Sequence, residues 1–276
     1  MKRLMVANLQ KTSKSRYMPE KFETLLKAQI HNALEVGWLP KNIILLTNFD
    51  FEFMEVKAQI IPLNDFCLSG SKMWGLKWLY DNTRVDYTIF ASDCDCWQNC
   101  WFNEPDFSTD VAACQYSNPK WNGGNIFWKP ESRDIVNKVV EILTENKAPN
   151  EEPTLNQVFR SEEYKDRITC LNSTYNVGCS GFFERFTRSD KPIRICHFHP
   201  PNSIAWEIHA LDRDGLGAMS VTIRLERLLR RYYDLATELK DKAVPQQKIE
   251  QRIERMKRNA EKVKRNAEKI VRKIKK

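Results

Sequence analysis

The sequence lacks an apolar run long enough to cross a membrane. No stretch of its 276 residues approaches the roughly 18 consecutive apolar residues that a membrane helix needs. The first residues, 1–7, hold an apolar part that is too short for a signal peptide. These absences argue against a membrane-spanning or exported protein. We therefore expect the chain to work in the cytoplasm.

The sequence also lacks the cysteine spacing of a disulfide framework or of a zinc clamp. Its eight cysteines are irregularly spaced, which in a chain of this length fits reduced thiols better than disulfides. Zinc is the main alternative for Cys94, Cys96, Cys100 and Cys114. Their C-x-C-x₃-C spacing, however, is not the usual paired C-x₂-C clamp. We therefore expect free thiols.

The body of the chain has almost no net charge, whereas its C-terminal end is strongly basic. Residues 240–276 contain 15 Lys and Arg against 5 Asp and Glu. Residues 1–239 contain 29 basic and 31 acidic side chains, so the net charge of +8 at pH 7 comes from the tail. A basic tail of this kind binds polyanions such as nucleic acid or an acidic membrane surface.

Apolar patterns predict a domain in which strands and helices alternate. We expect helices over residues 19–36, 71–80 and 132–146, and a further helix that Pro153 starts and that contains residues 156–160. We expect strands over residues 3–8, 42–48, 60–61, 86–92, 111–115, 125–128 and 192–197. This alternation predicts an α/β fold, a Rossmann-like and mostly parallel sheet with helices on both faces. We assign residues 1–215 to this domain and residues 216–276 to a basic helical extension.

The extension contains a repeat of seven residues, at 257–263 and 264–270. Apolar residues around it alternate by four and three, which is the spacing of a coiled-coil seam, thin because two of its members are alanine. Three interpretations stay open: a solvated and partly frayed helix, a weak coiled coil that self-associates, or a basic helix along a phosphate backbone. In the last case the acceptor would be bound by Lys257, Arg258, Lys264 and Arg265.

Two acidic residues and a histidine follow predicted strands. Asp93 and Asp95 come directly after a buried strand, at the edge of an α/β sheet where ligands bind. Both carboxylates are hard oxygen ligands for a dication such as Mg²⁺ or Mn²⁺. His197 ends another apolar strand and could complete a metal site. His199 competes for this role, because alternation along a strand sends it to the same side. Taken singly, each of these features is also common as a structural one.

Two further motifs have both a chemical and a structural interpretation. In the Asn122-Gly123-Gly124-Asn125 segment, the glycines would let the backbone approach a bound group and the asparagines can hydrogen-bond sugar hydroxyls. The alternative is a plain turn before a strand. The Glu151-Glu152 pair opens a predicted helix, where a carboxylate can stabilise the helix dipole. In an active site it could instead stabilise positive charge at the reacting carbon of a sugar.

With the four motifs in this order, the chain resembles the glycosyltransferases of the GT-A fold. It is closest in pattern to the retaining enzymes related to glycogenin, to bacterial galactosyltransferases and to the blood-group transferases. The resemblance spans roughly residues 3–206. The family's Gly-x-x-Lys-Pro-Trp segment, which follows its histidine, has only a loose counterpart in residues 200–206.

The resemblance implies a role for each motif. Asp93 and Asp95 would bind the metal, Mn²⁺ or Mg²⁺, together with the nucleotide diphosphate, and His197 would be the third metal ligand. The reaction centre would contain Asn122 and Glu152. The remaining donor contacts would come from Gly123, Gly124, Asn8 and Lys11.

These implications together indicate a metal-dependent glycosyltransferase that moves a sugar, by default from a UDP-sugar, to a hydroxyl acceptor, with retention favoured. The basic tail favours a polyanionic acceptor. Our leading hypothesis is hydroxymethylated pyrimidine in DNA, as in phage-type DNA glycosyltransferases, with the base flipped out of a duplex. The alternative is a lipid, lipopolysaccharide or protein acceptor at an anionic membrane surface. From another class, a non-enzymatic binding module would use the acidic pair structurally.

Overall fold

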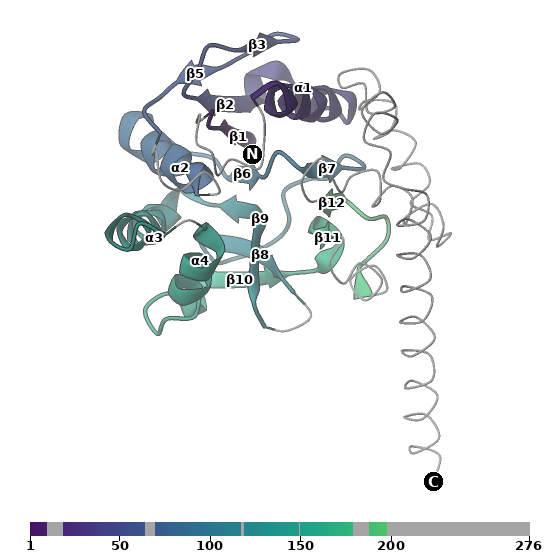
Figure 1. Ribbon diagram of the computed structural model, residues 1–276. Coiled ribbons are helices and arrows are strands. Elements are labelled where there is room, and N and C mark those ends of the chain that lie inside the picture. The colour runs from purple at the N-terminus through teal and green to yellow at the C-terminus, as the bar shows by residue number, and fades with distance from the viewer. Residues whose placement is uncertain (10–18, 64–69, 117–118, 149, 179–187, 198–276) are drawn as a thin grey trace, which may run out of the picture. The chain divides into compact units, whose positions relative to one another are not determined.

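The computed structural model describes residues 1–9, 19–63, 70–116, 119–148, 150–178 and 188–197, and Figure 1 shows how their elements are arranged. Lys11, His199 and the whole basic extension lie outside these residues, so what the sequence predicts of them stays a prediction. Within the described part of the chain, no helix is both long and apolar enough to cross a membrane.

The centre of the fold is a seven-stranded sheet in the order β10-β8-β9-β6-β1-β2-β5. Four of its six neighbouring pairs are parallel, and β9 runs antiparallel to both of its neighbours. The predicted α/β fold with a mostly parallel sheet is therefore confirmed. The strands are β1 (Lys2–Ala7), β2 (Ile43–Thr47), β5 (Gln59–Ile60), β6 (Ile89–Ser92), β8 (Val111–Gln115), β9 (Trp121–Trp128) and β10 (Ile168–Leu171).

Helices cover both faces of this sheet, as predicted. Successive strand residues point to opposite faces. In β9, Ile126 and Trp128 join the apolar cluster under three helices, whereas Phe127 joins the cluster under the fourth. The first face is covered by α2 (Ser71–Asn82), α3 (Arg133–Glu145) and α4 (Glu151–Phe159), and the second by α1 (Pro19–Glu35) (Figure 1).

A small three-stranded sheet lies beside α1. It consists of β11 (Val177–Gly178), β12 (Ile195–His197) and β7 (Cys96–Gln98), with β7 and β12 antiparallel. The sequence did not predict β7, β10 or β11, because runs of two to four residues show too little periodicity. A separate hairpin and four short 3₁₀ turns complete the described elements: β3 (Glu52–Phe53), β4 (Val56–Lys57), η1 (Pro40–Asn42), η2 (Pro130–Ser132), η3 (Lys165–Arg167) and η4 (Ser173–Tyr175).

Two element boundaries differ from the sequence prediction. The segment with the two glycines does not precede a strand but lies inside β9, which begins at Trp121. The helix that Pro153 was expected to start begins two residues earlier, at Glu151, as α4. Asn150 caps that helix, because its side-chain oxygen accepts a hydrogen bond from the Glu152 amide at 3.0 Å. Both differences place polar groups on regular elements that hold them more rigidly than a loop would.

Helix α2 packs closely on β1 because Gly75 has no side chain. A Cβ at this position would lie 2.6 Å from Cγ2 of Val6, closer than real contacts allow. Lys72 lies three residues earlier, on the same side of the helix. The close packing therefore directs Lys72 toward the sheet.

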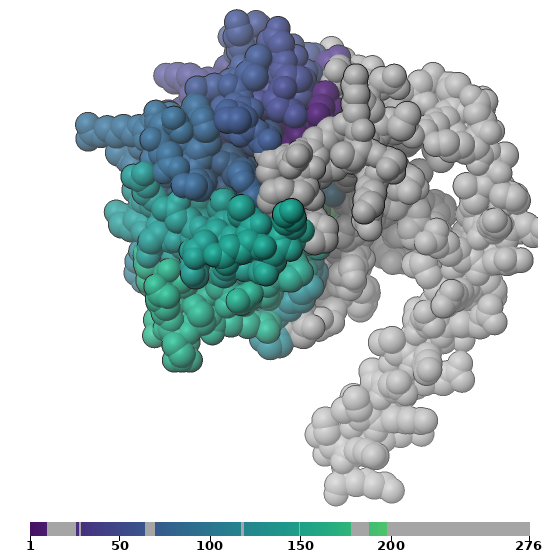
Figure 2. Space-filling view, turned by 60° about the vertical axis from the view of Figure 1, so that its left-hand side comes forward, coloured from purple at the N-terminus to yellow at the C-terminus, as the bar shows by residue number. Residues whose placement is uncertain are grey.

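The end of β6 lies where two halves of the described chain join. In the space-filling view, the purple and blue segments of the N-terminal half lie above the teal and green segments that follow (Figure 2). Pairing of β6 with β9, from Ile89 opposite Trp128 to Ser92 opposite Asn125, links these halves. The acidic turn that the sequence singled out follows β6 directly.

Candidate functional site

The acidic turn between β6 and β7 is fixed by the backbone. The Asp93 amide donates to the carbonyl oxygen of Gly124 in β9 at 2.8 Å, and the Cys96 amide donates to the Asp93 carbonyl oxygen at 3.1 Å. The turn therefore connects the carboxyl end of β6, in the seven-stranded sheet, to β7 in the small sheet within three residues. Both carboxylates lie at this junction, beyond the carboxyl end of β6, where open α/β sheets bind ligands.

His197 approaches the two carboxylates from the end of β12. Its Nε2 lies 3.2 Å from Oδ1 of Asp95 and 3.9 Å from Oδ2 of Asp93. Only 7% of the histidine is exposed. Burial lowers the pKa of His197, but the charges of Asp95 and Asp93 raise it, and the net direction is upward. The structure thus brings together the three residues that the sequence predicted as metal ligands.

A chain of buried amides orients the imidazole. Nδ1 of His197 lies 3.2 Å from Oδ1 of Asn176, and Nδ2 of Asn176 donates to Oδ1 of Asn122. The same Asn122 oxygen accepts from the Gly124 amide at 2.8 Å. With a proton on Nδ1, the ring directs Nε2 toward the carboxylates, where it pairs with Asp95 when protonated and offers a lone pair when neutral. Asn122, predicted to contact a sugar, is here part of the support of His197.

The two glycines of β9 make room for site side chains. A Cβ on Gly124 would lie 2.4 Å from Cε1 of His197, and a Cβ on Gly123 would lie 3.2 Å from Oε1 of Glu151. The sequence predicted that these glycines let the backbone approach a bound group. In the structure they let it approach the imidazole and a carboxylate of the protein itself.

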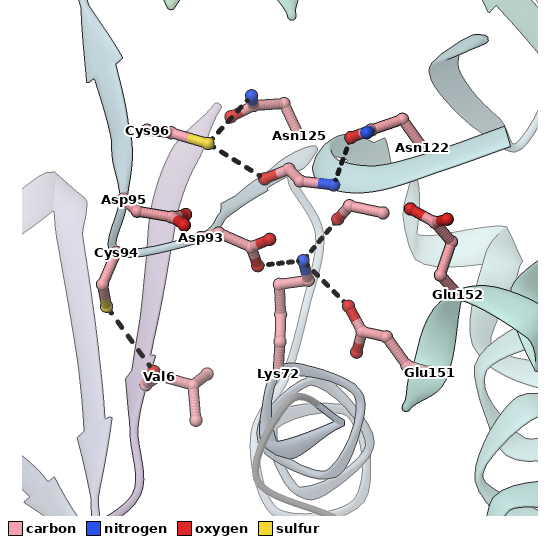
Figure 3. A network of polar contacts seen from close by, with 12 residues as sticks. Val6, Lys72, Asp93, Cys94, Asp95, Cys96, Asn122, Asn125, Glu151 and Glu152 are labelled. Carbon is pink, nitrogen blue, oxygen red and sulfur yellow. Dashed lines mark hydrogen bonds and ion pairs between the residues drawn. The ribbon is translucent and has the colours of Figure 1, made fainter. Parts of the chain in front are cut away.

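Lys72 is the centre of the polar network at this site (Figure 3). Its Nζ lies 2.5 Å from Oδ1 of Asp93 and 3.1 Å from Oε1 of Glu151, and it donates to the Gly123 carbonyl oxygen. The side chain is 5% exposed. Burial lowers the pKa of Lys72, but the two carboxylates raise it well above its ordinary value. The ammonium is therefore charged and joins α2, the acidic turn, β9 and α4.

Each carboxylate beside Lys72 pairs with the ammonium through only one of its two oxygens. Asp93 uses Oδ1 for the ammonium, and its Oδ2 faces His197. Burial raises the pKa of Asp93, which the Lys72 charge opposes. Burial likewise raises the pKa of Glu151 to about 7 against the opposing effect of Lys72. Oε2 of Glu151 is buried and has no hydrogen-bond partner among the residues that the structure describes. An unpaired buried carboxylate oxygen is a candidate acceptor for a ligand hydroxyl.

Glu152 lies on another side of α4. Its carboxylate accepts from the Tyr116 hydroxyl at 2.7 Å and lies 2.5 Å from Nζ of Lys120. The sequence pointed to Glu152 at the reaction centre, whereas the structure has Glu151 beside Lys72 and Asp93. Consecutive residues at a helix start point about 100° apart, so the phase of the helix decides which of the two joins the network.

Asn8 lies at the end of β1, near the start of the helix that carries Lys72. Its Nδ2 donates to Oγ of Ser71 at 2.7 Å, and its Oδ1 accepts from Asn48 at 3.0 Å. Lys11 and His199, also predicted for the site, lie outside the described residues. The same holds for the tail residues Lys257, Arg258, Lys264 and Arg265.

Three residues at the site were missed by the sequence analysis. The sequence does contain a signal for Lys72. This lysine falls on the apolar stripe that Leu76 and Leu79 continue, where an unpaired lysine would be unfavourable. Asn176 directly precedes the short strand β11, and no sequence pattern indicates its role. Cys96 was considered only together with other cysteines. In the structure, one ligand atom each of Asp95, Cys96 and His197 lie within 4.8 Å of one another.

Comparisons with known proteins show the fold. No family model and no curated protein matches the sequence. An active-site mutant of LgtC has a TM-score of 0.50 at 13% identity, over 73% of this chain and 88% of that chain. Glycosyltransferase GlyE of Streptococcus pneumoniae TIGR4 has a TM-score of 0.50 at 11% identity, over 72% of this chain and 55% of that chain. The chain therefore has the GT-A glycosyltransferase fold that the sequence predicted.

Replacing Lys72 by methionine should destabilise the fold, because Asp93 and Glu151 lose their shared cation. Breaking a buried ion pair by removing one partner costs about 3–5 kcal/mol. We expect a loss near the lower limit, ~3 kcal/mol in the free energy of unfolding by urea, since 35% of the Asp93 side chain is exposed.

Lys77→Met on the same helix is the matched control. Lys77 pairs with Asp81 at 2.6 Å and donates to Asn137 of α3 at 3.2 Å, with 38% of its side chain exposed. An exposed pair of this kind contributes at most about 1 kcal/mol. Equal losses in the two variants would show that the buried network adds nothing to stability.

Proposed function

We propose that this chain is a metal-dependent glycosyltransferase that transfers a sugar from a nucleotide-sugar donor, by default a UDP-sugar, to a hydroxyl group. One observation carries the proposal: His197 Nε2 lies within 4 Å of both Asp93 and Asp95, although β12 and the acidic turn are far apart in the sequence. The three side chains converge at the sheet edge where α/β folds bind ligands. The GT-A fold and the GlyE likeness are consistent with this chemistry.

The donor set fits a divalent metal ion. Asp93, Asp95 and His197 would hold it, with two hard carboxylates and one imidazole suited to Mn²⁺ or Mg²⁺. Such a dication, when bound, neutralises a diphosphate and stabilises it as a leaving group. Lys72 keeps Oδ1 of Asp93 occupied and leaves Oδ2 directed toward His197. The protein therefore presets the orientation of this carboxylate.

Glu151 and Glu152 would share the contacts to the sugar. Oε2 of Glu151, buried and without a partner among the described residues, would accept a hydrogen bond from a donor-sugar hydroxyl. Glu152 would stabilise positive charge at the anomeric carbon, as the sequence resemblance implies. Tyr116 and Lys120 hold its carboxylate in one orientation. The resemblance also favours retention of the anomeric configuration.

Metal dependence is tested with Asp95→Asn and with a chelator. Loss of one carboxylate should reduce Mn²⁺ affinity at least ~100-fold, since even changes outside the ligand shell cost 10–100-fold. Hydrolysis of UDP-sugars, followed as UDP release, should fall in parallel. Asp86→Asn is the control, because Asp86 is exposed and pairs only loosely with Arg84 at 3.5 Å. Full turnover in excess chelator would contradict the proposal.

The two glutamates should differ in kinetics. Glu152→Gln should lower kcat far more than it changes donor affinity, if the charge acts only in the transition state. Glu151→Gln should instead raise KM for the donor, because a ground-state hydrogen bond to the sugar weakens. Steady-state kinetics over a series of UDP-sugar concentrations separates the two effects. A Glu152→Gln enzyme with unchanged kcat and a lower melting temperature would assign Glu152 to the start of α4 instead.

For the acceptor we propose hydroxymethylated pyrimidine in DNA. The support is the charge distribution, since a nearly neutral body is joined to a tail that carries a net charge of about +10, summed over residues 240–276. Such a tail would hold a polyanion while one hydroxyl reacts. A duplex base would have to leave the stack for its hydroxyl to reach the site.

Truncation after Pro245 tests the acceptor. It removes 13 basic and 4 acidic residues and no described residue. We expect the KM for hydroxymethylated DNA to rise at least ~10-fold while UDP-sugar hydrolysis stays unchanged, because the lost contacts are phosphate contacts. Binding by the full chain should also weaken steeply with salt. Unchanged DNA affinity, together with lost binding to anionic vesicles, would instead favour the acceptor at a membrane surface.

A further inference from the structure

Cys96 lies beside the proposed metal ligands. It is directly opposite His197 in the β7–β12 pair, so both side chains lie on the same face of the small sheet. Cys96 is fully buried, and its Sγ, an Asp95 oxygen and a His197 nitrogen lie within 4.8 Å of one another. Three nearby cysteines point elsewhere. The thiols of Cys94, Cys100 and Cys114 are directed to the carbonyl oxygens of Val6, Ile193 and Asn172, respectively.

Two groups of β9 contact the sulfur of Cys96. Nδ2 of Asn125 donates to Sγ of Cys96 at 3.2 Å, and a hydrogen bond of this direction strengthens when the sulfur is charged. The thiol proton is directed to the Gly124 carbonyl oxygen at 3.6 Å, which already accepts from the Asp93 amide at 2.8 Å. Loss of the proton therefore leaves that oxygen paired.

We propose that Cys96 is a ligand of the divalent metal, so that sulfur, nitrogen and oxygen atoms share one site. This inference rests on the proposed metal-dependent function. On binding, the S–H bond breaks, the proton passes to solvent, and the sulfur lone pair forms the bond to the metal. Burial raises the pKa of the free Cys96 thiol, so it is the dication that displaces the proton.

The geometry requires only a small closure. With Zn–S near ~2.3 Å and Zn–N near ~2.0 Å, tetrahedral ligands lie about 3.5 Å apart. The present limit of 4.8 Å between the ligand atoms exceeds this by roughly an ångström. A thiolate is a soft ligand, so the site should prefer Zn²⁺ or Co²⁺ to Mg²⁺. The cysteine spacing gave no zinc signal because Asp95 and His197, not further cysteines, complete this donor set.

Cobalt absorption tests the inference directly. The metal-free full chain is titrated with Co²⁺, and a sulfur-to-cobalt charge-transfer band in the near ultraviolet is expected. Cys96→Ser should lose the band, whereas Cys94→Ser, the matched control one residue before Asp95, should keep it. Zn²⁺ affinity should fall at least ~10-fold in Cys96→Ser, while Mn²⁺ affinity changes by less than about threefold, because Mn²⁺ gains little from sulfur.

The spectrum of the wild type decides the question even if a variant fails to fold. Cobalt binding without the band, or a band that persists in folded Cys96→Ser, would overturn the inference. If Mn²⁺-dependent turnover remains in that case, the proposed function stands without the sulfur ligand. Absence of any divalent-metal binding would overturn both.

Discussion

The shared ammonium of Lys72 is the interaction on which the site depends. It lies on α2 and contacts the acidic turn, the backbone of β9 and the start of α4 (Figure 3). These elements are distant in sequence, and without the cation the buried Glu151 carboxylate and the half-buried Asp93 carboxylate would repel each other. The close packing of Gly75 on Val6 determines how near the lysine comes to the sheet. A contact within the apolar core thus positions a charge in the polar network.

The antiparallel strand β9 is the second constraint. Its backbone carries Gly123 and Gly124 past the site and supplies carbonyl oxygens to Lys72 and to the Asp93 amide. Its missing side chains leave the space that the His197 ring and the Glu151 carboxylate occupy. Asn122, on the same strand, supports the imidazole through Asn176. The strand therefore acts as a template against which side chains from four other elements are placed.

The sequence predicted the parts of this arrangement that depend on strand ends. Asp93, Asp95 and His197 follow apolar runs, and the ends of strands meet at one edge of a sheet, so their proximity could be predicted. The choice between Glu151 and Glu152 could not, because it depends on where α4 begins and on the cap at Asn150. Two adjacent glycines are typical of a turn, and only the packing of Glu151 against Gly123 and of His197 against Gly124 explains them within a strand. Asn176 leaves no periodic signal, and the three-residue strand β7 is too short for one.

The contact between Asp95 and His197 bears on the order in which the protein assembles. In many small metal-binding domains the ligands repel one another or lie unpaired until the ion arrives, so chain and ion must come together in one event. Here a histidine whose pKa is raised by neighbouring carboxylates, and a lysine ammonium, compensate the acidic groups from within the chain. If the site binds the proposed metal ion, the polypeptide could complete its core first and bind the ion afterwards. Newly synthesised chains could then fold and remain metal-free. The supply of the ion would control which fraction of the chains is active rather than which fraction is folded.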